Sequence, residues 1–437
     1  MTRSTLLSQF AALLMLLPAA RPAAAYSFQT HEQLIDLTWK ASIRPLLLAR
    51  YPNLTPAQLQ EAHAYAYGGC AIQDIGYYPF GNGFYSGLMH YVRTGDFVRS
   101  LLRNAHTADE LAFAIGALSH YIADNIGHPE AVNLAVPVEF PKLEKKYGHN
   151  INYGEDPHAH VRTEFAFDID QISKNRMASS AYLHHVGLFV ATDLLRKAFF
   201  ETYGIDLQPL LGKKQRVLKG YSFALRSFLP RIAYAETVLH RKHFPPDTPG
   251  EPLEKLKKAL AQSAADNGWE QYRGKAGIRT YMMAGLIFIL PKFGPLSYLA
   301  IRGPSPHTQE MYVESLNRSI DALRLALSHF NHLAPYLPDR DLDTGLKVKP
   351  GGYRLTDETY AQLLAALTSK PTSTIPIHLQ QDILSYYADP SAPIITKKNK
   401  AKWARVQAQL KVLATMATTT DPDPDVDAAP PQPTQQP

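Results

Sequence analysis

The sequence predicts an all-α fold, because helix-start signals recur along it and long runs of alternating β-branched and polar residues are missing. Thr55 and Gln58 flank a proline in one capping box, and Thr107 with Glu110 forms a second. The second box opens a helix that carries the stretch SHYIADNIGHPEAV, residues 119–132. We therefore expect a multi-helix domain followed by a helical C-terminal extension.

Helical signals continue into the second half of the chain. The further helices are expected at residues 178–202, 215–243, 307–331, 356–368, 377–388 and 397–417. The proline-dense segment HFPPDTPGEP, residues 243–252, is the best candidate domain boundary. It would separate an N-terminal domain, residues 26–243, from a helical region of unassigned role, residues 253–417. The low-complexity end, residues 418–437, is predicted to be disordered.

Residues 1–25 have the layout of a secretory signal peptide. Arg3 precedes the apolar run LLSQFAALLMLLPAA, and an AxA cleavage site ends at Ala25. A membrane anchor is the alternative, but the run is too short to span a bilayer and contains polar residues and Pro18. We therefore expect export to the periplasm or the medium, with Tyr26 as the first residue after cleavage.

Cysteine content and charge narrow the class of protein further. The single cysteine, Cys70, cannot form an internal disulfide, so an exported chain would draw its stability from its core or from bound metal. The formal net charge of +6 is modest and is not gathered into one long run. This argues against tight nucleic-acid binding and is compatible with contact to anionic surfaces.

Histidine and carboxylate residues recur at spacings that suit metal ligands. His120, Asp124 and His128 follow one another at four-residue steps, which places them on neighbouring rows of one helix face. His160 and Glu164 form a second pair one turn apart. Three more candidates precede them in the sequence, namely His31, Asp74 and His90. Burying so many ionisable groups without a cation would be costly, so together they indicate a metal site.

These motifs resemble those of the zinc-dependent phospholipases C of bacteria, whose fold is shared with fungal single-strand-specific nucleases. HYIAD is similar to the family's HYxxD element, HPEAV follows shortly after it, and HVRTEF resembles the family's HxxxE element. The motifs lie within residues 26–170. The resemblance implies an α-helical domain with three zinc ions and phosphodiesterase activity on a phospholipid or another phosphodiester.

The resemblance also implies which residues hold each zinc ion. The first ion would have four ligands, which are Asp74, His90, His120 and Asp124. The second ion would have three ligands, which are His128, His160 and Glu164. The third would be held by His31, by Asp124 as a bridge and by main-chain atoms of Tyr26, where the family usually has tryptophan. Asp74 is the candidate to orient or deprotonate the reacting water.

Two ligand positions leave alternatives open. Relatives generally place the next histidine about six residues after the helix aspartate, whereas His128 follows Asp124 by four and the six-residue position is Glu130. Either His128 or Glu130 is therefore the ligand. His158 is an alternative to His160, although only His160 lies one turn before the glutamate. Five other histidines fit no motif and are interpreted as structural: His63, His106, His184, His185 and His240.

Two segments bear on the substrate. The loop between Asp74 and His90 is rich in aromatic residues, namely Tyr77, Tyr78, Phe80, Phe84 and Tyr85. They would either receive a choline headgroup or a base, or pack the loop onto the domain. Residues 280–301 approach the length of a membrane span but contain two prolines and a lysine. They would form a buried helical hairpin or an interfacial segment that contacts lipid.

The sequence thus predicts an exported zinc-dependent phosphodiesterase of phospholipase C type, with peripheral membrane contact and no specific nucleic-acid partner. One alternative is a single-strand nuclease or nucleotidase on the same zinc scaffold. Another is a protein without turnover that keeps the zinc-held domain for stability and binds a lipid or a partner through its second half.

Overall fold

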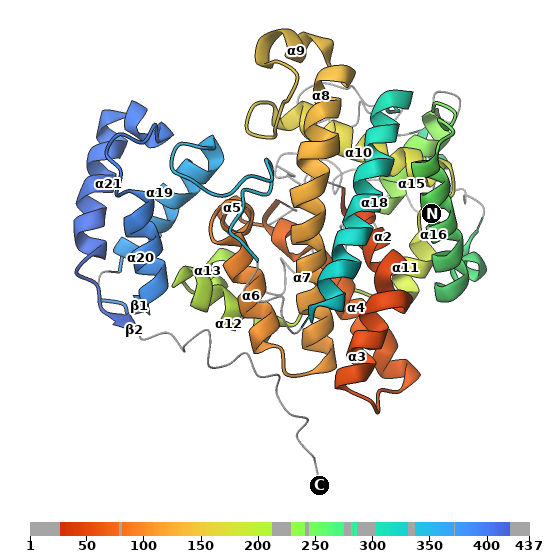
Figure 1. The fold of residues 1–437 in the computed structure, drawn as a ribbon, viewed down its shortest axis with the longest axis horizontal. Coiled ribbons are helices and arrows are strands. Elements are labelled where there is room, and N and C mark those ends of the chain that lie inside the picture. The colour runs from red at the N-terminus through yellow and green to blue at the C-terminus, as the bar shows by residue number, and fades with distance from the viewer. Residues whose placement is uncertain are drawn as a thin grey trace.

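The computed structural model describes residues 27–77, 81–211, 229–240, 244–274, 281–282, 284–285, 303–330, 337–370 and 372–419. Within these ranges the fold is all-α, as predicted (Figure 1). The described strands are β1 (Ile375–Pro376) and β2 (Thr418–Thr419), which pair in parallel. The second strand uses two residues at the start of the segment that was predicted to be disordered.

The first half of the chain forms a bundle of helices and short helical turns. They are α2 (Phe28–Thr38), η1 (Trp39–Ile43), α3 (Arg44–Arg50), α4 (Pro56–Cys70), η2 (Ile72–Tyr77), α5 (Gly83–Tyr91), α6 (Thr94–Asn104), α7 (Ala108–Gly127), η3 (His128–Val132), α8 (Asn133–Glu139), α9 (Pro141–Tyr147), α10 (Pro157–Ser173), α11 (Ser180–Val186), α12 (Thr192–Tyr203) and α13 (Leu207–Leu211). Both predicted capping boxes are present, one at the start of α4 and one at the start of α7.

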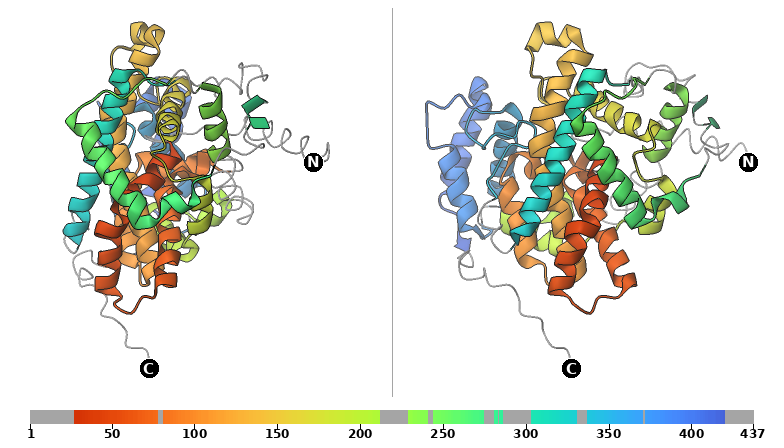
Figure 2. Two further views of the ribbon diagram at one scale, coloured as in Figure 1. Left: turned by 90° about the vertical axis from the view of Figure 1, so that its right-hand side faces the viewer. Right: turned by 45° about the vertical axis from the view of Figure 1, so that its right-hand side comes forward.

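The second half adds helices that pack against this bundle. They are α15 (Leu229–His240), α16 (Glu251–Asn267), η5 (Trp269–Tyr272), α18 (Pro306–Ser328), α19 (Arg354–Thr368), α20 (Ile377–Tyr386), η9 (Ile395–Lys398) and α21 (Lys400–Leu413). Figure 1 shows α7 near the middle of the molecule, between α6 and α18, and both views in Figure 2 keep α18 beside α7. α19 packs on α5. One cluster of buried side chains includes Phe113 of α7, Leu316 of α18 and Leu363 of α19, so segments on both sides of the proline-dense break share a core.

α4 and α7 approach each other closely enough for backbone to touch backbone. A Cβ atom on Gly69 would lie 2.0 Å from the carbonyl oxygen of Phe113, and one on Gly116 would lie 2.2 Å from that of Ala66. Both positions therefore require glycine. The close approach brings the C-terminal end of α4 against the middle of α7, where the predicted ligands begin.

Replacing Gly116 with alanine is expected to lower the free energy of unfolding by about 1–3 kcal/mol, because the added methyl group overpacks this contact. The nearest atoms are backbone atoms of Ala66 and Cys70, which cannot move without shifting α4. Gly83→Ala is the matched control, since a Cβ there meets no atom within 4 Å. Urea or thermal denaturation of both variants checks this prediction, and equal stability of the two would contradict the close approach.

The predicted helix over residues 178–202 is wrong as a single element, because the structure has two helices there. α11 ends at Gly187, whose φ of +99° suits glycine. The following residues cross α4, where the amide of Phe189 donates to the carbonyl of Ala64. A Cβ on Gly68 would lie 1.6 Å from the Phe189 carbonyl oxygen, so the crossing depends on a second glycine.

The other predicted helices in the second half agree with the structure within a few residues at each end, where it describes them. Residues 215–228 of one predicted helix lie outside the described part, as do Tyr26 and the expected signal peptide. Most of residues 280–301 also lies outside it. Among the residues that the structure does describe, no helix is long and apolar enough to cross a membrane.

Candidate metal centre

The eight predicted side-chain ligands lie in three groups, each residue at most 1% exposed. They come from α2, η2, α5, α7, η3 and α10. In each group the ligand atoms lie within 4.8 Å of one another. The groups are His31 with His120 and Asp124, Asp74 with His90 and His120, and His128 with His160 and Glu164. The first two share a residue and therefore form one continuous cluster.

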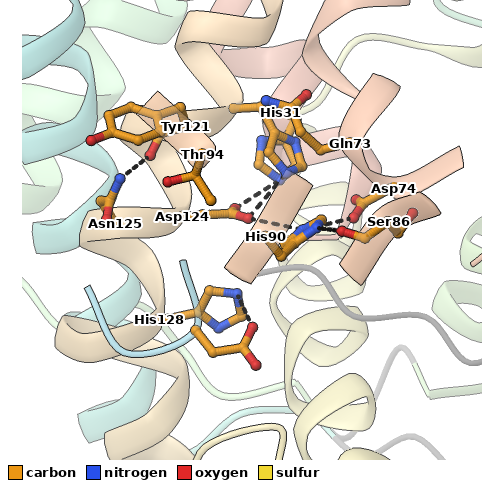
Figure 3. Close-up of polar contacts among 12 residues, drawn as sticks. His31, Gln73, Asp74, Ser86, His90, Thr94, Tyr121, Asp124, Asn125 and His128 are labelled. Carbon is orange, nitrogen blue, oxygen red and sulfur yellow. Dashed lines mark hydrogen bonds and ion pairs between the residues drawn. The ribbon is translucent and has the colours of Figure 1, made fainter. Parts of the chain in front are cut away.

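Asp124 occupies the middle of that cluster and faces three imidazoles (Figure 3). Its Oδ2 atom lies 3.0 Å from Nε2 of His120 and 3.5 Å from Nε2 of His90. Its Oδ1 atom lies 3.4 Å from Nε2 of His31. Asp74 adds a second carboxylate, with Oδ1 3.3 Å from Nε2 of His90.

Backbone carbonyls fix the orientation of two of these imidazoles. Nδ1 of His90 donates to the carbonyl of Ser86 at 2.8 Å, and Nδ1 of His120 donates to that of Cys70 at 2.8 Å. A carbonyl oxygen can only accept, so in the neutral ring Nδ1 carries the proton and Nε2 presents its lone pair. Metal-binding histidines are commonly oriented in this way.

Hydrogen bonds also orient an imidazole in the third group. Asn133 donates from Nδ2 to the carbonyl of Asp343 at 2.7 Å, which fixes its amide, and its Oδ1 lies 3.0 Å from Nε2 of His160. The other ring nitrogen of His160, Nδ1, lies 2.7 Å from Oε1 of Glu164. The ring of His128 stacks on that of His160 with centroids 4.9 Å apart. In the tautomer in which Nε2 of His160 donates to Asn133, Nδ1 of His160 presents its lone pair to the Glu164 carboxylate.

The electrostatics of the first cluster favour a cation. Burial lowers the pKa of His90, but the carboxylates of Asp124 and Asp74 outweigh burial and hold that pKa well above its usual range. The balance is similar for His120, whose pKa is also raised. Burial raises the pKa of Asp124, yet the adjacent imidazoles of His120, His90 and His31 more than offset this and hold it well below its usual range. Burial raises the pKa of Asp74.

The unpartnered atoms show that zinc fits this place. Several buried atoms of ligand type make no hydrogen bond, and they are both carboxylate oxygens of Asp74 and of Asp124, Nε2 of His90, His120 and His128, and Nδ1 of His160. An unsatisfied buried polar group costs about 1–3 kcal/mol. A lone pair that faces a carboxylate needs a proton or a metal ion between them. Imidazole and carboxylate together are a donor set that zinc prefers.

In a comparison with protein families, residues 30–207 match the model described as zinc dependent phospholipase C. Residues 30–207 belong to the zinc-dependent phospholipase C family. The range covers all three groups of candidate ligands. Comparisons with curated proteins and with solved structures gave no match. This match and the buried clusters described above support a zinc-dependent phospholipase C-like enzyme.

For each of the two ligand positions that the sequence left open, the structure places one of the two alternatives in a group of candidate ligands. His128 lies in the third group, whereas Glu130 turns away and pairs with Arg318 at 2.9 Å. His160 lies beside Glu164, and His158 belongs to none of the three groups. Thus the four-residue step from Asp124 to His128 does not put both in one group, because α7 ends at Gly127 and the π-helical turn η3 begins at His128.

The histidines interpreted as structural belong to none of the three groups. His63 is buried and lies 2.9 Å from Asp36, His184 donates to the carbonyl of Ser180, and His185 stacks on Tyr272. His106 is exposed, and the side chain of His240 lies outside the described part.

The aromatic residues of the Asp74–His90 segment divide between site and core. The ring of Tyr77 lies 5.5 Å from that of His90, so it borders the metal centre. Tyr85 is fully buried and donates its hydroxyl to the carbonyl of Ile72, and Phe84 packs against the core. These two serve packing. Tyr78 and Phe80 lie outside the described residues.

Two residues at the centre were not predicted from the sequence. Asn133 orients His160, and Asp343 places Oδ1 3.7 Å from Nε2 of His128. Asp343 lies far beyond the family range, in the segment DRDLDTG, which matches none of the family motifs described above. Only the fold brings it to His128.

Proposed function

We propose that the chain is an exported zinc-dependent phosphodiesterase of phospholipase C type, which hydrolyses the headgroup phosphodiester of phospholipids. The observation that carries the proposal is the convergence of eight buried ligand-type side chains within the family range. Two carboxylates in one cluster with three imidazoles form a charged centre that a phosphodiester reaction can use without a serine or cysteine nucleophile.

Zinc held at the centre would polarise the phosphoryl oxygens and make a water molecule acidic enough to react near neutral pH. Asp74 is the residue that we assign to orient this water and accept its proton, because neither of its carboxylate oxygens makes a hydrogen bond. The carbonyls of Ser86 and Cys70 keep the imidazoles aimed at the centre during the reaction. Tyr77 forms one wall beside His90, where it can contact a headgroup.

The experiment that tests this function is a paired assay of the protein from residue 26 onward, with and without zinc. One substrate is phosphatidylcholine in micelles and the other is a single-stranded oligonucleotide. We expect zinc-dependent release of the phosphorylated headgroup and little cleavage of the oligonucleotide. Equal or faster oligonucleotide cleavage would favour a nuclease or nucleotidase. A zinc-loaded protein that cleaves neither substrate would favour a binding role.

We propose three zinc ions and a ligand role for the main chain of Tyr26. Removal of the signal peptide would then be needed to complete the site. The start of α2 is held in place near this residue. Asp168 accepts from the amide of Gln29 at 3.2 Å and from the hydroxyl of Thr30 at 2.5 Å. The next residue is His31, so the start of α2 lies close to the first cluster.

A protein with extra residues before Tyr26 is therefore expected to hold one zinc ion fewer than the cleaved protein and to lose most of its activity. An amide nitrogen has no lone pair available for zinc, whereas a free amine has one. Elemental analysis and rates for the cleaved and extended proteins check this prediction. Tyr26→Trp is the control and should resemble the cleaved protein, because only main-chain atoms are involved. Full zinc content in the extended protein would remove Tyr26 from the ligand set.

A further inference from the structure

Asp343 lies in a segment from outside the family range that packs directly on the metal centre. We call residues 337–346 the strap. The amide of Leu342 donates to the carbonyl of His90 at 2.9 Å, and Asn133 donates to the carbonyl of Asp343 at 2.7 Å. The strap is thus bonded to the backbone of one candidate ligand and to the residue that orients another.

The strap also fits closely against the turn that carries His128. Gly345 has a φ of +68°, and a Cβ there would lie 2.8 Å from the carbonyl oxygen of Asn125 and 3.0 Å from the ring of Pro129. A side chain at this position would push the strap away from the centre. The close contact fixes the distance between Asp343 and His128.

Two tyrosines hold the Asp343 carboxylate in one orientation. Its Oδ2 atom accepts from the hydroxyl of Tyr91 at 2.9 Å and from that of Tyr353 at 2.6 Å. Its Oδ1 atom makes no hydrogen bond, although the residue is fully buried. That oxygen points to Nε2 of His128, which is also buried without a hydrogen bond.

The distance between these two atoms suits two ligands of one metal ion. At 3.7 Å, Oδ1 and Nε2 are too far apart for a hydrogen bond. Two ligand atoms at about 2.0–2.2 Å from one tetrahedral zinc ion are separated by about 3.4 Å. An unpartnered carboxylate oxygen and an unpartnered imidazole nitrogen at nearly this separation are a pair of donor atoms that lacks its cation.

We propose that Asp343 is a carboxylate ligand of the metal ion held by His128, His160 and Glu164, so that the C-terminal region completes the second metal site. With two carboxylates and two neutral imidazoles, the ligand set balances the charge of a divalent ion. Such a site binds its metal more firmly and polarises substrate less than one with a single carboxylate. The inference deepens the proposed function because it rests on the same metal centre, but it does not depend on which phosphodiester is cleaved.

The competing explanation is that Asp343 only accepts hydrogen bonds from the two tyrosines. Asp343→Asn distinguishes the two, because an amide oxygen still accepts from both hydroxyls while the negative charge at His128 is lost. Asp341→Asn is the matched control. Asp341 is buried in the same strap and accepts from Thr344 and Thr356, and it belongs to none of the groups of candidate ligands.

The experiment measures metal binding without substrate. Its result therefore tests the role of Asp343 even if the protein fails to cleave a phosphodiester. Each variant of the protein from residue 26 onward is loaded with zinc or cobalt(II), and metal content, affinity in competition with a chelator, and the visible absorption of cobalt are recorded. We expect Asp343→Asn to lose at least about tenfold in affinity at one site, as even outer partners of ligands contribute that much. Its cobalt spectrum should change, and Asp341→Asn should match the wild type in both measurements.

Asp343→Asn with wild-type metal content, affinity and cobalt spectrum would overturn the proposal and leave Asp343 as an acceptor for the tyrosines. If that variant folds poorly, Tyr353→Phe gives the answer instead. It keeps the carboxylate but removes one of the two bonds that aim it, so we expect a smaller loss of affinity at the same site. Unchanged affinity and an unchanged cobalt spectrum in Tyr353→Phe would then count against a ligand role.

Discussion

Asp124→Asn is expected to release zinc and to reduce phosphodiester turnover by more than about 100-fold, since loss of an outer partner of a metal ligand alone costs about 10–100-fold. Asp124 lies within 3.5 Å of imidazole nitrogens from His31, His90 and His120, and no other candidate carboxylate faces all three. Without its charge the three rings lose the anion that holds them together. Zinc content per chain and initial rates check this prediction.

Asp36→Asn is the matched control for that variant. Asp36 is also a buried carboxylate next to a histidine, with Oδ1 2.9 Å from Nε2 of His63 and 2.7 Å from the hydroxyl of Tyr67. It belongs to none of the three groups. Asp36→Asn should lose stability but keep its zinc and its turnover per folded molecule. If Asp124→Asn behaves in the same way, Asp124 is a structural carboxylate and not the centre of the metal site.

The part of the site that local helix geometry determines could be predicted from the sequence. His120 with Asp124 and His160 with Glu164 are pairs one turn apart, and any regular helix through them brings their side chains together. The capping box at Thr107 identifies the start of α7 and so sets which face carries the first pair. A motif of this kind needs no knowledge of the rest of the fold.

Other features could not be predicted because they depend on where a regular helix stops. The sequence places His128 on the same face as Asp124, but the change to a π-helical turn at His128 directs its ring to His160. The break at Gly187 depends on a backbone crossing at Gly68, which no local pattern reports. In both cases a contact with a distant element overrides the helical periodicity.

Asp343 is the clearest example of a site residue that could not be predicted from the sequence. None of the candidate ligands lies near it in sequence, and its approach to His128 depends on Gly345 fitting against α7 and on two tyrosines from α5 and the loop before α19. The sequence therefore predicts no role for the second half at the metal centre. The structure gives it a direct contact with the metal centre.

Removing zinc with a chelator is expected to lower the Tm by about 10 °C near neutral pH. A ligand at 1,000 times its Kd stabilises the folded state by about 4 kcal/mol, and each kcal/mol shifts the Tm of a medium-sized domain by about 2–4 °C. The chelated protein must keep the carboxylates of Asp74 and Asp124 buried among imidazoles with no metal between them.

The decrease in Tm on removal of zinc should be larger at pH 8 than at pH 6. In the zinc-free fold, burial lowers the pKa values of His90 and His120, but the adjacent carboxylates outweigh burial and raise both. A raised histidine pKa contributes stability that is fully present below the unfolded value, about 6.5, and is lost as pH rises through the folded value. Zinc requires the neutral imidazole and takes the place of those protons. The stability that zinc adds therefore grows with pH, as the stability that the protons add is lost.

The measurement is the Tm of zinc-loaded and chelated protein at pH 6, 7 and 8. The gap between the two curves should widen with pH, because the chelated protein loses its proton-dependent stability while the zinc-loaded protein has no such protons to lose. Asp124→Asn is the internal control, since it lacks one of the two carboxylates that raise both imidazole pKa values. Its chelated form should depend less on pH. A gap that stays constant or narrows would mean that His90 and His120 do not exchange protons for metal and that the first cluster is not a zinc site.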